Sequence, residues 1–149
     1  IEGDPSAHKN PIIGNLFKHD FEKDGKFNHH IPNIDLGWCV SVSEHIEERA
    51  VYDFLDVFKK CKWVVFTWCP IGFPGYHHVN CQEAPYWIEK FKEINFSYCP
   101  KLTAKLKYDF AKLVMIKTPY WRDTRLNAKK VGKKYLWSWG MIFKNDTIT

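Results

Sequence analysis

Two short polar segments carry the residue types that could do chemistry. Ser43-Glu44-His45 follows one apolar run, and a loop that reads YHHVN at residues 76–80 follows the next. An imidazole exchanges protons near neutral pH, and imidazole and carboxylate together can bind a cation. Packing alone explains such groups poorly at the ends of apolar strands. The two segments therefore predict a site.

The elements that must position these residues alternate between strands and helices. Continuous apolar runs are typical of buried parallel strands, and apolar residues with helical spacing predict amphipathic helices. The expected elements in chain order are a strand at 12–17, a loop at 22–33, a strand at 36–42, a helix at 47–60, a strand at 62–69, a loop at 71–82, a helix at 85–94, a strand at 96–99, a helix at 104–118 and a strand at 135–143. Parallel strands present their carboxyl ends at one edge of a sheet, so we expect His45 and His78 at the same edge.

The length and composition of the chain favour a single α/β domain. It has 149 residues, of which 45% are hydrophobic, and no apolar run near 18 residues that would predict a membrane span. The polar, proline-containing start IEGDPSAHKNP does not resemble a signal peptide. Five cysteines without a C-x-x-C pair favour a reducing compartment. We expect a cytoplasmic protein without membrane contact.

The charge of the chain is unevenly distributed. Residues 1–100 carry 10 Lys and Arg against 14 Asp and Glu, whereas residues 101–149 carry 12 against 3. The basic segment 119–134 also contains the sequence Tyr120-Trp121-Arg122, and aromatic residues among cations can bind nucleic acid. An anionic partner and a solvated lysine face both explain this pattern. For the aromatic residues we favour an insertion that packs on the domain edge.

The segment 35–46, DLGWCVSVSEHI, resembles the fourth strand of class I S-adenosylmethionine (SAM)-dependent methyltransferases, which often read D-L-x₅-V-x-E-H there. Residues 1–3 and 18–21 resemble the ends of the second and third strands of that family. The GYHHVN loop at 75–80, followed by Tyr86-Trp87, resembles a subgroup common in phage and environmental sequences. The resemblance covers nearly the whole chain.

The resemblance implies a Rossmann-like α/β sheet, mostly parallel, with an antiparallel C-terminal strand. It implies a SAM-dependent methyltransferase that acts on an oxygen or nitrogen of an unidentified acceptor. His45 is the expected catalytic base or orienting group, and His78 is the second choice. The expected cofactor-binding residues are Glu2, Gly3, Asp20, Phe21, Val42, Ser43 and Glu44.

One motif of the family is missing, because no G-x-G sequence occurs in the chain. The glycine-rich loop lets the backbone approach the cofactor closely, and its strand lies in the middle of the family's sheet. We therefore expect residues 1–149 to be the C-terminal part of one methyltransferase domain, or to receive the missing strand from a second chain. The alternative is a non-catalytic methyltransferase-like module that has lost the cofactor loop.

Three interpretations of Glu44-His45 follow. His45 can act as a general base, and this is the role we assign. In some relatives an E-x-x-E-H pattern binds a divalent metal; here Ser41 takes the first position, and Glu44, His45 and one of His77 or His78 would complete a three-ligand site. The structural alternative is a turn capped by Ser43.

Overall fold

A computed structural model describes residues 17–117 and 139–149, which form an α/β fold. The elements are β1 (Ile34–Cys39), α1 (Val51–Asp56), β2 (Cys61–Thr67), α2 (Ala84–Glu93), β3 (Phe96–Tyr98), α3 (Pro100–Lys117) and β4 (Gly140–Asn145). Short 3₁₀ turns lie at Ser43–His45, Glu48–Ala50 and Val57–Lys60. Of the helices in these ranges, none is both long and apolar enough to cross a membrane.

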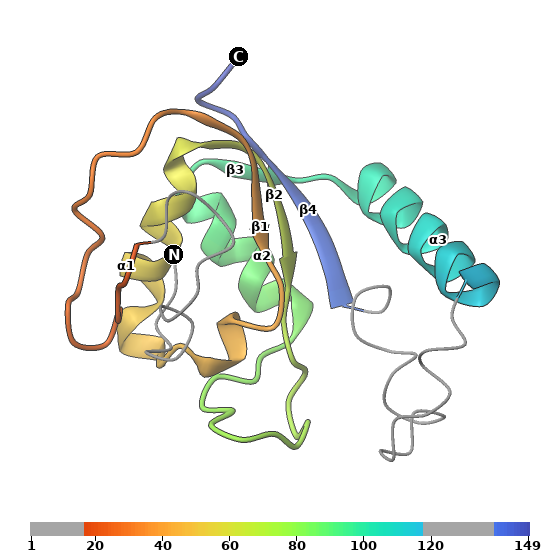
Figure 1. The fold of residues 1–149 in the computed structure, drawn as a ribbon, viewed down its shortest axis with the longest axis horizontal. Coiled ribbons are helices and arrows are strands. Elements are labelled where there is room, and N and C mark those ends of the chain that lie inside the picture. Colours follow the sequence, from red (N-terminus) through yellow and green to blue (C-terminus); the bar gives the residue numbers. More distant parts are fainter. Residues whose placement is uncertain (1–16, 118–138) are drawn as a thin grey trace.

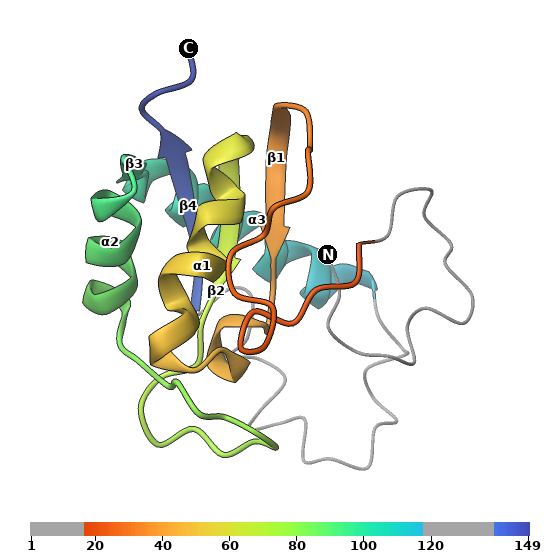
Figure 2. The ribbon, with the colours of Figure 1, turned by 90° about the vertical axis from the view of Figure 1, so that its left-hand side faces the viewer.

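The described strands form one mixed sheet in the order β1-β2-β4-β3. β1 and β2 are parallel, with Leu36 opposite Trp63. β4 is antiparallel to both of its neighbours, so β1, β2 and β3 run in one direction and β4 in the other. α1 and α2 cover one face of the sheet and α3 lies on the opposite side (Figures 1 and 2). The expected α/β class and the antiparallel C-terminal strand are confirmed.

Aromatic side chains hold α1 and α2 against the sheet. Phe66 of β2 lies 5.0 Å from both Trp87 and Phe91 of α2, measured between ring centroids. Phe91 also stacks on Phe143 of β4, with centroids 3.9 Å apart. All four side chains are completely buried, and burying such a ring stabilises a fold by about 2–3 kcal/mol. The core therefore fixes β2, whose end carries part of the site.

The structure moves the boundaries of several predicted elements. β1 ends at Cys39, three residues before the end of the predicted strand 36–42, because Ser41 adopts a left-handed backbone with φ of 56°. The predicted helix 47–60 is a shorter α-helix between two 3₁₀ turns. Residues 12–16, the basic segment 119–134 and the first half of the predicted strand 135–143 lie outside the described residues.

β1 forms one edge of the sheet as far as the described residues extend, since β2 is its one strand partner there. The side chains of Leu36 and Trp38 on this strand are exposed to 50% and 54%. This is the edge beside which the family resemblance predicts a further strand. Such a strand stays a prediction.

Candidate functional site

Hydrogen bonds tie the ends of β1 and β2 together just before the first polar segment. The hydroxyl of Ser43 donates to the main-chain carbonyl of Thr67 over 3.0 Å, and the amide of Ser41 donates to the Thr67 hydroxyl over 2.9 Å. Ser43 and Thr67 are buried. The 3₁₀ turn Ser43–His45 is thus anchored to the neighbouring strand, and its position does not depend on β1 alone.

The loop between β2 and α2 is fastened to the same turn. The amides of Val79 and Asn80 both donate to the main-chain carbonyl of Glu44, over 2.9 and 3.1 Å. This pairing brings His78 beside Glu44 and His45, although 33 residues separate His78 from His45 in the sequence. The expectation that the two segments meet at one edge of the sheet is confirmed.

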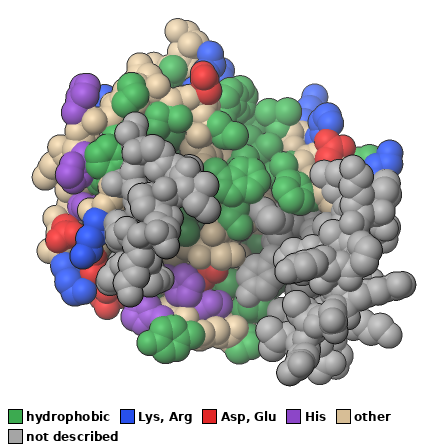
Figure 3. Space-filling view, in the orientation of Figure 1, with side chains coloured by type: hydrophobic (Ala, Val, Ile, Leu, Met, Phe, Trp, Pro, Cys, Tyr) green, Lys and Arg blue, Asp and Glu red, His purple; other side chains and the backbone are tan. Residues whose placement is uncertain are grey.

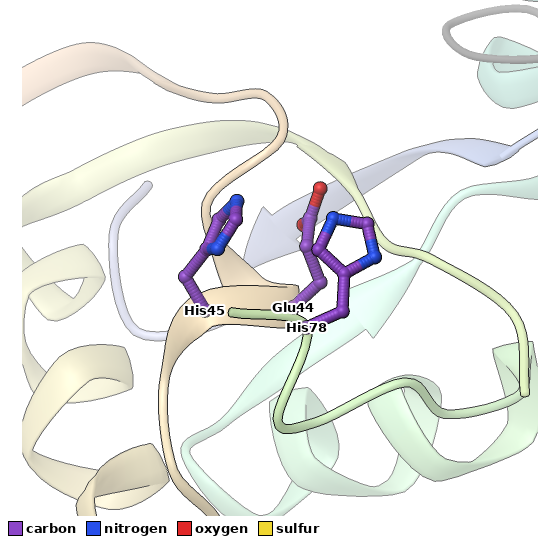
Figure 4. A group of neighbouring side chains, drawn as sticks. All are labelled: Glu44, His45 and His78. Atoms are coloured by element: carbon purple, nitrogen blue, oxygen red, sulfur yellow. The ribbon is translucent and has the colours of Figure 1, made fainter. Parts of the chain in front are cut away.

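Glu44, His45 and His78 form a compact cluster (Figure 4). One carboxylate oxygen and one ring nitrogen from each imidazole lie within 4.8 Å of one another. Glu44 is 2% exposed, and the two histidines are half-buried. The cluster therefore has a buried acidic floor and two imidazoles that solvent can reach.

The Glu44 carboxylate is incompletely satisfied. Its Oε1 accepts a hydrogen bond from the Cys69 thiol over 3.4 Å, whereas Oε2 is buried and has no hydrogen-bond partner among the described residues. None of the ion pairs within the described residues involves Glu44. Burial of a carboxylate without a compensating partner is unfavourable. Such a group indicates a binding function better than a structural one.

Main-chain carbonyls set the tautomer of both imidazoles. His45 Nδ1 lies 3.0 Å from the carbonyl oxygen of His77, and His78 Nδ1 lies 3.3 Å from that of Phe73. A carbonyl oxygen can only accept, so each Nδ1 carries the proton. In the neutral ring, Nε2 then keeps its lone pair. Each imidazole therefore presents an Nε2 lone pair that can accept a proton or bind a cation. His45 does so from the turn after β1 and His78 from the loop after β2.

Gly75 makes room for the His78 ring. A Cβ atom at position 75 would lie 2.2 Å from both Nε2 and Cε1 of His78, far inside van der Waals contact. Any larger residue would displace the ring. His77, in contrast, is exposed and has a left-handed backbone with φ of 52°. The structure therefore selects His78 over His77 as the third member of the cluster.

The thiols of Cys39 and Cys81 are affected by the charge of Glu44. Burial, and then the negative charge of Glu44, raises the pKa of Cys39 and of Cys81. Cys81 Sγ lies 3.9 Å from His78 Nδ1. Because both thiols are held in the protonated state, neither is a ready nucleophile or anionic ligand at neutral pH.

The other predicted site residues are dispersed or serve local structure. Asp20 closes a surface turn: its Oδ1 accepts from the amide of Glu22 and its Oδ2 from Lys23 Nζ, over 3.1 and 2.7 Å. Phe21 packs edge-on against Phe54 of α1. Val42 is exposed and lies next to the cluster in the chain, while the Ser43 hydroxyl joins the strands. Glu2 and Gly3 lie outside the described residues.

Sequence reasoning missed two contributors to the cluster. Cys69 donates to Glu44, and Gly75 admits the His78 ring. A glycine three residues before a histidine in a loop is a weak signal for the second. No local signal points to the first, since Cys69 ends the apolar run 62–69 that predicts a buried strand.

Comparison of the chain with protein-family models, with curated proteins and with solved structures gives no match.

Proposed function

We propose that this protein is a SAM-dependent methyltransferase that transfers a methyl group to an oxygen or nitrogen atom held at the Glu44–His45–His78 cluster. The observation that carries the proposal is the position of this cluster. It lies where two neighbouring parallel strands, β1 and β2, present their carboxyl ends. Open α/β sheets bind their ligands at that edge.

The order of the strands supports the family resemblance. The alternation of apolar runs and helical segments predicts parallel strands ending near Asp20, Ser43 and Cys69 and an antiparallel strand from the C-terminus among them. The strand expected before Asp20 lies almost wholly outside the described residues. β1 and β2 are neighbours and parallel, and β4 is inserted antiparallel between β2 and β3. A helix, α2, follows the histidine loop as the family pattern requires.

In the proposed reaction, an imidazole of the cluster removes the proton from the acceptor atom or holds the acceptor in position by a hydrogen bond. His45 Nε2 has a lone pair, and the hydrogen bond from Nδ1 to the His77 carbonyl holds the ring in place. A positioned base of this kind contributes about 10²–10⁴-fold to a rate. His78 is oriented in the same way and is the second choice.

Exposed apolar side chains lie next to the loop histidines in the chain. Tyr76 is 95% exposed and Val79 47% exposed, and both flank the histidines in the loop. In Figure 3 histidines gather at the lower edge of the molecule beside a hydrophobic side chain. An acceptor with a flat or apolar portion would find contacts here, because tyrosine offers a large surface at low entropic cost.

Cofactor contacts are proposed at the backbone of residues 42–44. The family resemblance implies further contacts from Asp20 and Phe21. A hydrogen bond from Glu47 N to Glu22 Oε1, 3.3 Å long, links the Asp20 turn to the segment after His45. Both oxygens of Asp20 are engaged in its own turn. On the resemblance Asp20 would face the adenine amino group of the cofactor, which would therefore have to compete with Lys23 for that carboxylate.

The proposal is tested by titration calorimetry of the full chain with SAM and by transfer of a tritiated methyl group to pooled RNA, DNA, protein and small-molecule acceptors. We expect SAM binding and label transfer to one pool. The His45→Ala variant should keep the SAM affinity and lose transfer. The exposed His30→Gln is the matched control for loss of a histidine.

A non-catalytic module is the second candidate, and the lack of a G-x-G sequence favours it. The two proposals differ in one measurement. A chain that binds no SAM at millimolar concentration, although it is folded by circular dichroism, would reject the methyltransferase and leave the binding module.

A further inference from the structure

We propose that Glu44, His45 and His78 bind a divalent transition-metal ion of the Zn²⁺ type. The inference goes beyond the proposed function, because metal binding at this cluster does not require methyl transfer. It starts from the unsatisfied oxygen, Glu44 Oε2, which is buried without a hydrogen-bond partner among the described residues. A bound cation would compensate for the burial of this carboxylate.

The spacing within the cluster suits an ion better than direct hydrogen bonds. The three groups do not pair with one another: both Nδ1 atoms face main-chain carbonyls, and Oε1 faces the Cys69 thiol. Their ligand atoms nevertheless lie within 4.8 Å of one another. Two ligands of one tetrahedral Zn²⁺ lie ~3.4 Å apart, given bonds of ~2.1 Å. An inward movement of about 1 Å would close the site around an ion.

The histidines have the second contact that metal-binding histidines require. Such a histidine almost always donates its other ring N–H to a carbonyl or carboxylate, which fixes the ring and its tautomer. His45 donates to the His77 carbonyl and His78 to the Phe73 carbonyl. Both lone pairs are thus on Nε2, where an ion would need them.

The backbone holds the ligands in place before any ion arrives. The carbonyl of Glu44 accepts from the amides of Val79 and Asn80, so the ligand on the first strand end fixes the loop that carries the third ligand. Ser43 and Thr67 join the two strand ends below. A preorganised site of this kind loses little entropy on binding.

The donor set points to the kind of metal. Two imidazoles and one carboxylate are preferred by Zn²⁺ and its first-row neighbours, whereas Mg²⁺ and Ca²⁺ prefer oxygen ligands throughout. Three protein ligands also leave a coordination position open, which is typical of catalytic rather than structural sites.

An occupied site would refine the part that His45 plays. On the proposed function, and only on it, His45 Nε2 would then be a ligand and the acceptor atom would occupy the open position. A methyl acceptor with a hydroxyl group would fit that position best. This step depends on the methyltransferase proposal, whereas the metal site does not.

The experiment measures Zn²⁺ binding to the full chain after removal of metals with a chelator, in a reducing buffer, by competition with a colorimetric chelator. Co²⁺ spectra report the coordination geometry in parallel. We expect one ion per chain. His45→Ala and His78→Ala should each weaken binding by about 100-fold or more, and Gly75→Ala by at least 10-fold, because the new methyl group displaces the His78 ring.

The control variant is His77→Asn, which removes an adjacent exposed imidazole while asparagine tolerates the left-handed backbone at that position. It should bind Zn²⁺ as the unmodified chain does. Circular dichroism confirms that each variant is folded. If His45→Ala or His78→Ala does not fold, Gly75→Ala still tests the site, because it retains all three ligands.

Absence of Zn²⁺ and Co²⁺ binding to the folded unmodified chain would overturn the proposal. So would equal affinity in His45→Ala, His78→Ala and His77→Asn, which would place the ion on the cysteines. Failure to bind SAM would leave the metal site untouched.

Discussion

The molecule holds a histidine next to a carboxylate in two places, His19-Asp20 and Glu44-His45, and the two differ in how fully their polar atoms are satisfied. His19 is 6% exposed, its Nε2 donates to the Gly25 carbonyl over 2.9 Å, and the ring of Phe21 packs edge-on against it with centroids 4.6 Å apart. Asp20 pairs with Lys23 at the surface. His19 and Asp20 thus each have a hydrogen-bond partner within their own turn.

The second pair is incomplete. Glu44 is buried with an unpaired oxygen, and His45 keeps a lone pair on Nε2 that faces no proton donor among the described residues. The backbone around it is well bonded, so the deficit is confined to the side chains. Residue type at a strand end therefore does not by itself identify a site, whereas unmet hydrogen-bonding capacity on a rigid frame is a better indicator.

The largest effect that separates the two regions is expected on methyl transfer. His45→Ala should lower the rate by about 10²–10⁴-fold, because it removes the base or orienting group at the acceptor. The affinity for SAM should barely change, since the imidazole serves the acceptor. The measurement is single-turnover transfer of a tritiated methyl group, with SAM affinity from calorimetry. Full activity in His45→Ala would make this residue equivalent to His19.

The converse effect is expected on stability. His19→Ala should lower the free energy of unfolding by about 2–3 kcal/mol, because it removes a buried hydrogen bond and leaves a cavity between Phe21 and Phe27. Urea unfolding followed by circular dichroism measures the loss, and the exposed His30→Ala is the control. Zn²⁺ affinity should stay unchanged. A loss of Zn²⁺ affinity in a folded His19→Ala protein would contradict the separation of the two regions.

A smaller effect of opposite sign is expected at Glu44. In metal-free protein, Glu44→Gln should raise the free energy of unfolding by about 1 kcal/mol, because it replaces a buried carboxylate that has one unpartnered oxygen with a neutral amide. With Zn²⁺ at 100 times its Kd, the unmodified chain should gain about 2.7 kcal/mol and the variant much less. Urea unfolding with and without Zn²⁺ tests both arms. A marked loss of stability in the metal-free variant would show that the carboxylate is already well paired.

The fold could largely be predicted from the sequence because its signals are local. The apolar run before Pro70 gave β2 within two residues, and the spacing of Trp87, Ile88 and Phe91 gave α2 within one residue at each end. The end of β1 could not be predicted. It depends on the left-handed backbone of Ser41 and on its hydrogen bond to Thr67, which lies 26 residues away.

The site could be predicted only in part. Parallel strands place His45 and His78 at one edge, and this followed from the pattern. The choice between His77 and His78 did not, because adjacent loop histidines have no preferred side. That choice is made by contacts distant in sequence, the two amides on the Glu44 carbonyl and the space over Gly75. The assignment of SAM and of its contacts at Glu2, Gly3 and Asp20 stays a prediction from the resemblance.

The smallest effect is expected at Asp20, where pH reports the turn. The hydrogen bond from Lys23, followed by the amide of Glu22, lowers the Asp20 pKa below its ordinary value of 3.8. A carboxyl whose pKa is lowered in the folded state contributes stability above the unfolded value, and this contribution is lost as the pH falls through the folded value. Asp20→Asn should therefore reduce stability at pH 6 and have no effect near pH 2. Because the pair is at the surface, the loss should be a fraction of that at His19. Thermal unfolding at the two pH values measures it, with the exposed Asp35→Asn as control. The same variant shows whether Asp20 belongs to the site. Unchanged SAM affinity would leave Asp20 in a structural pair with His19, whereas weaker SAM binding at pH 7 in a folded protein would make Asp20 part of the same site as Glu44.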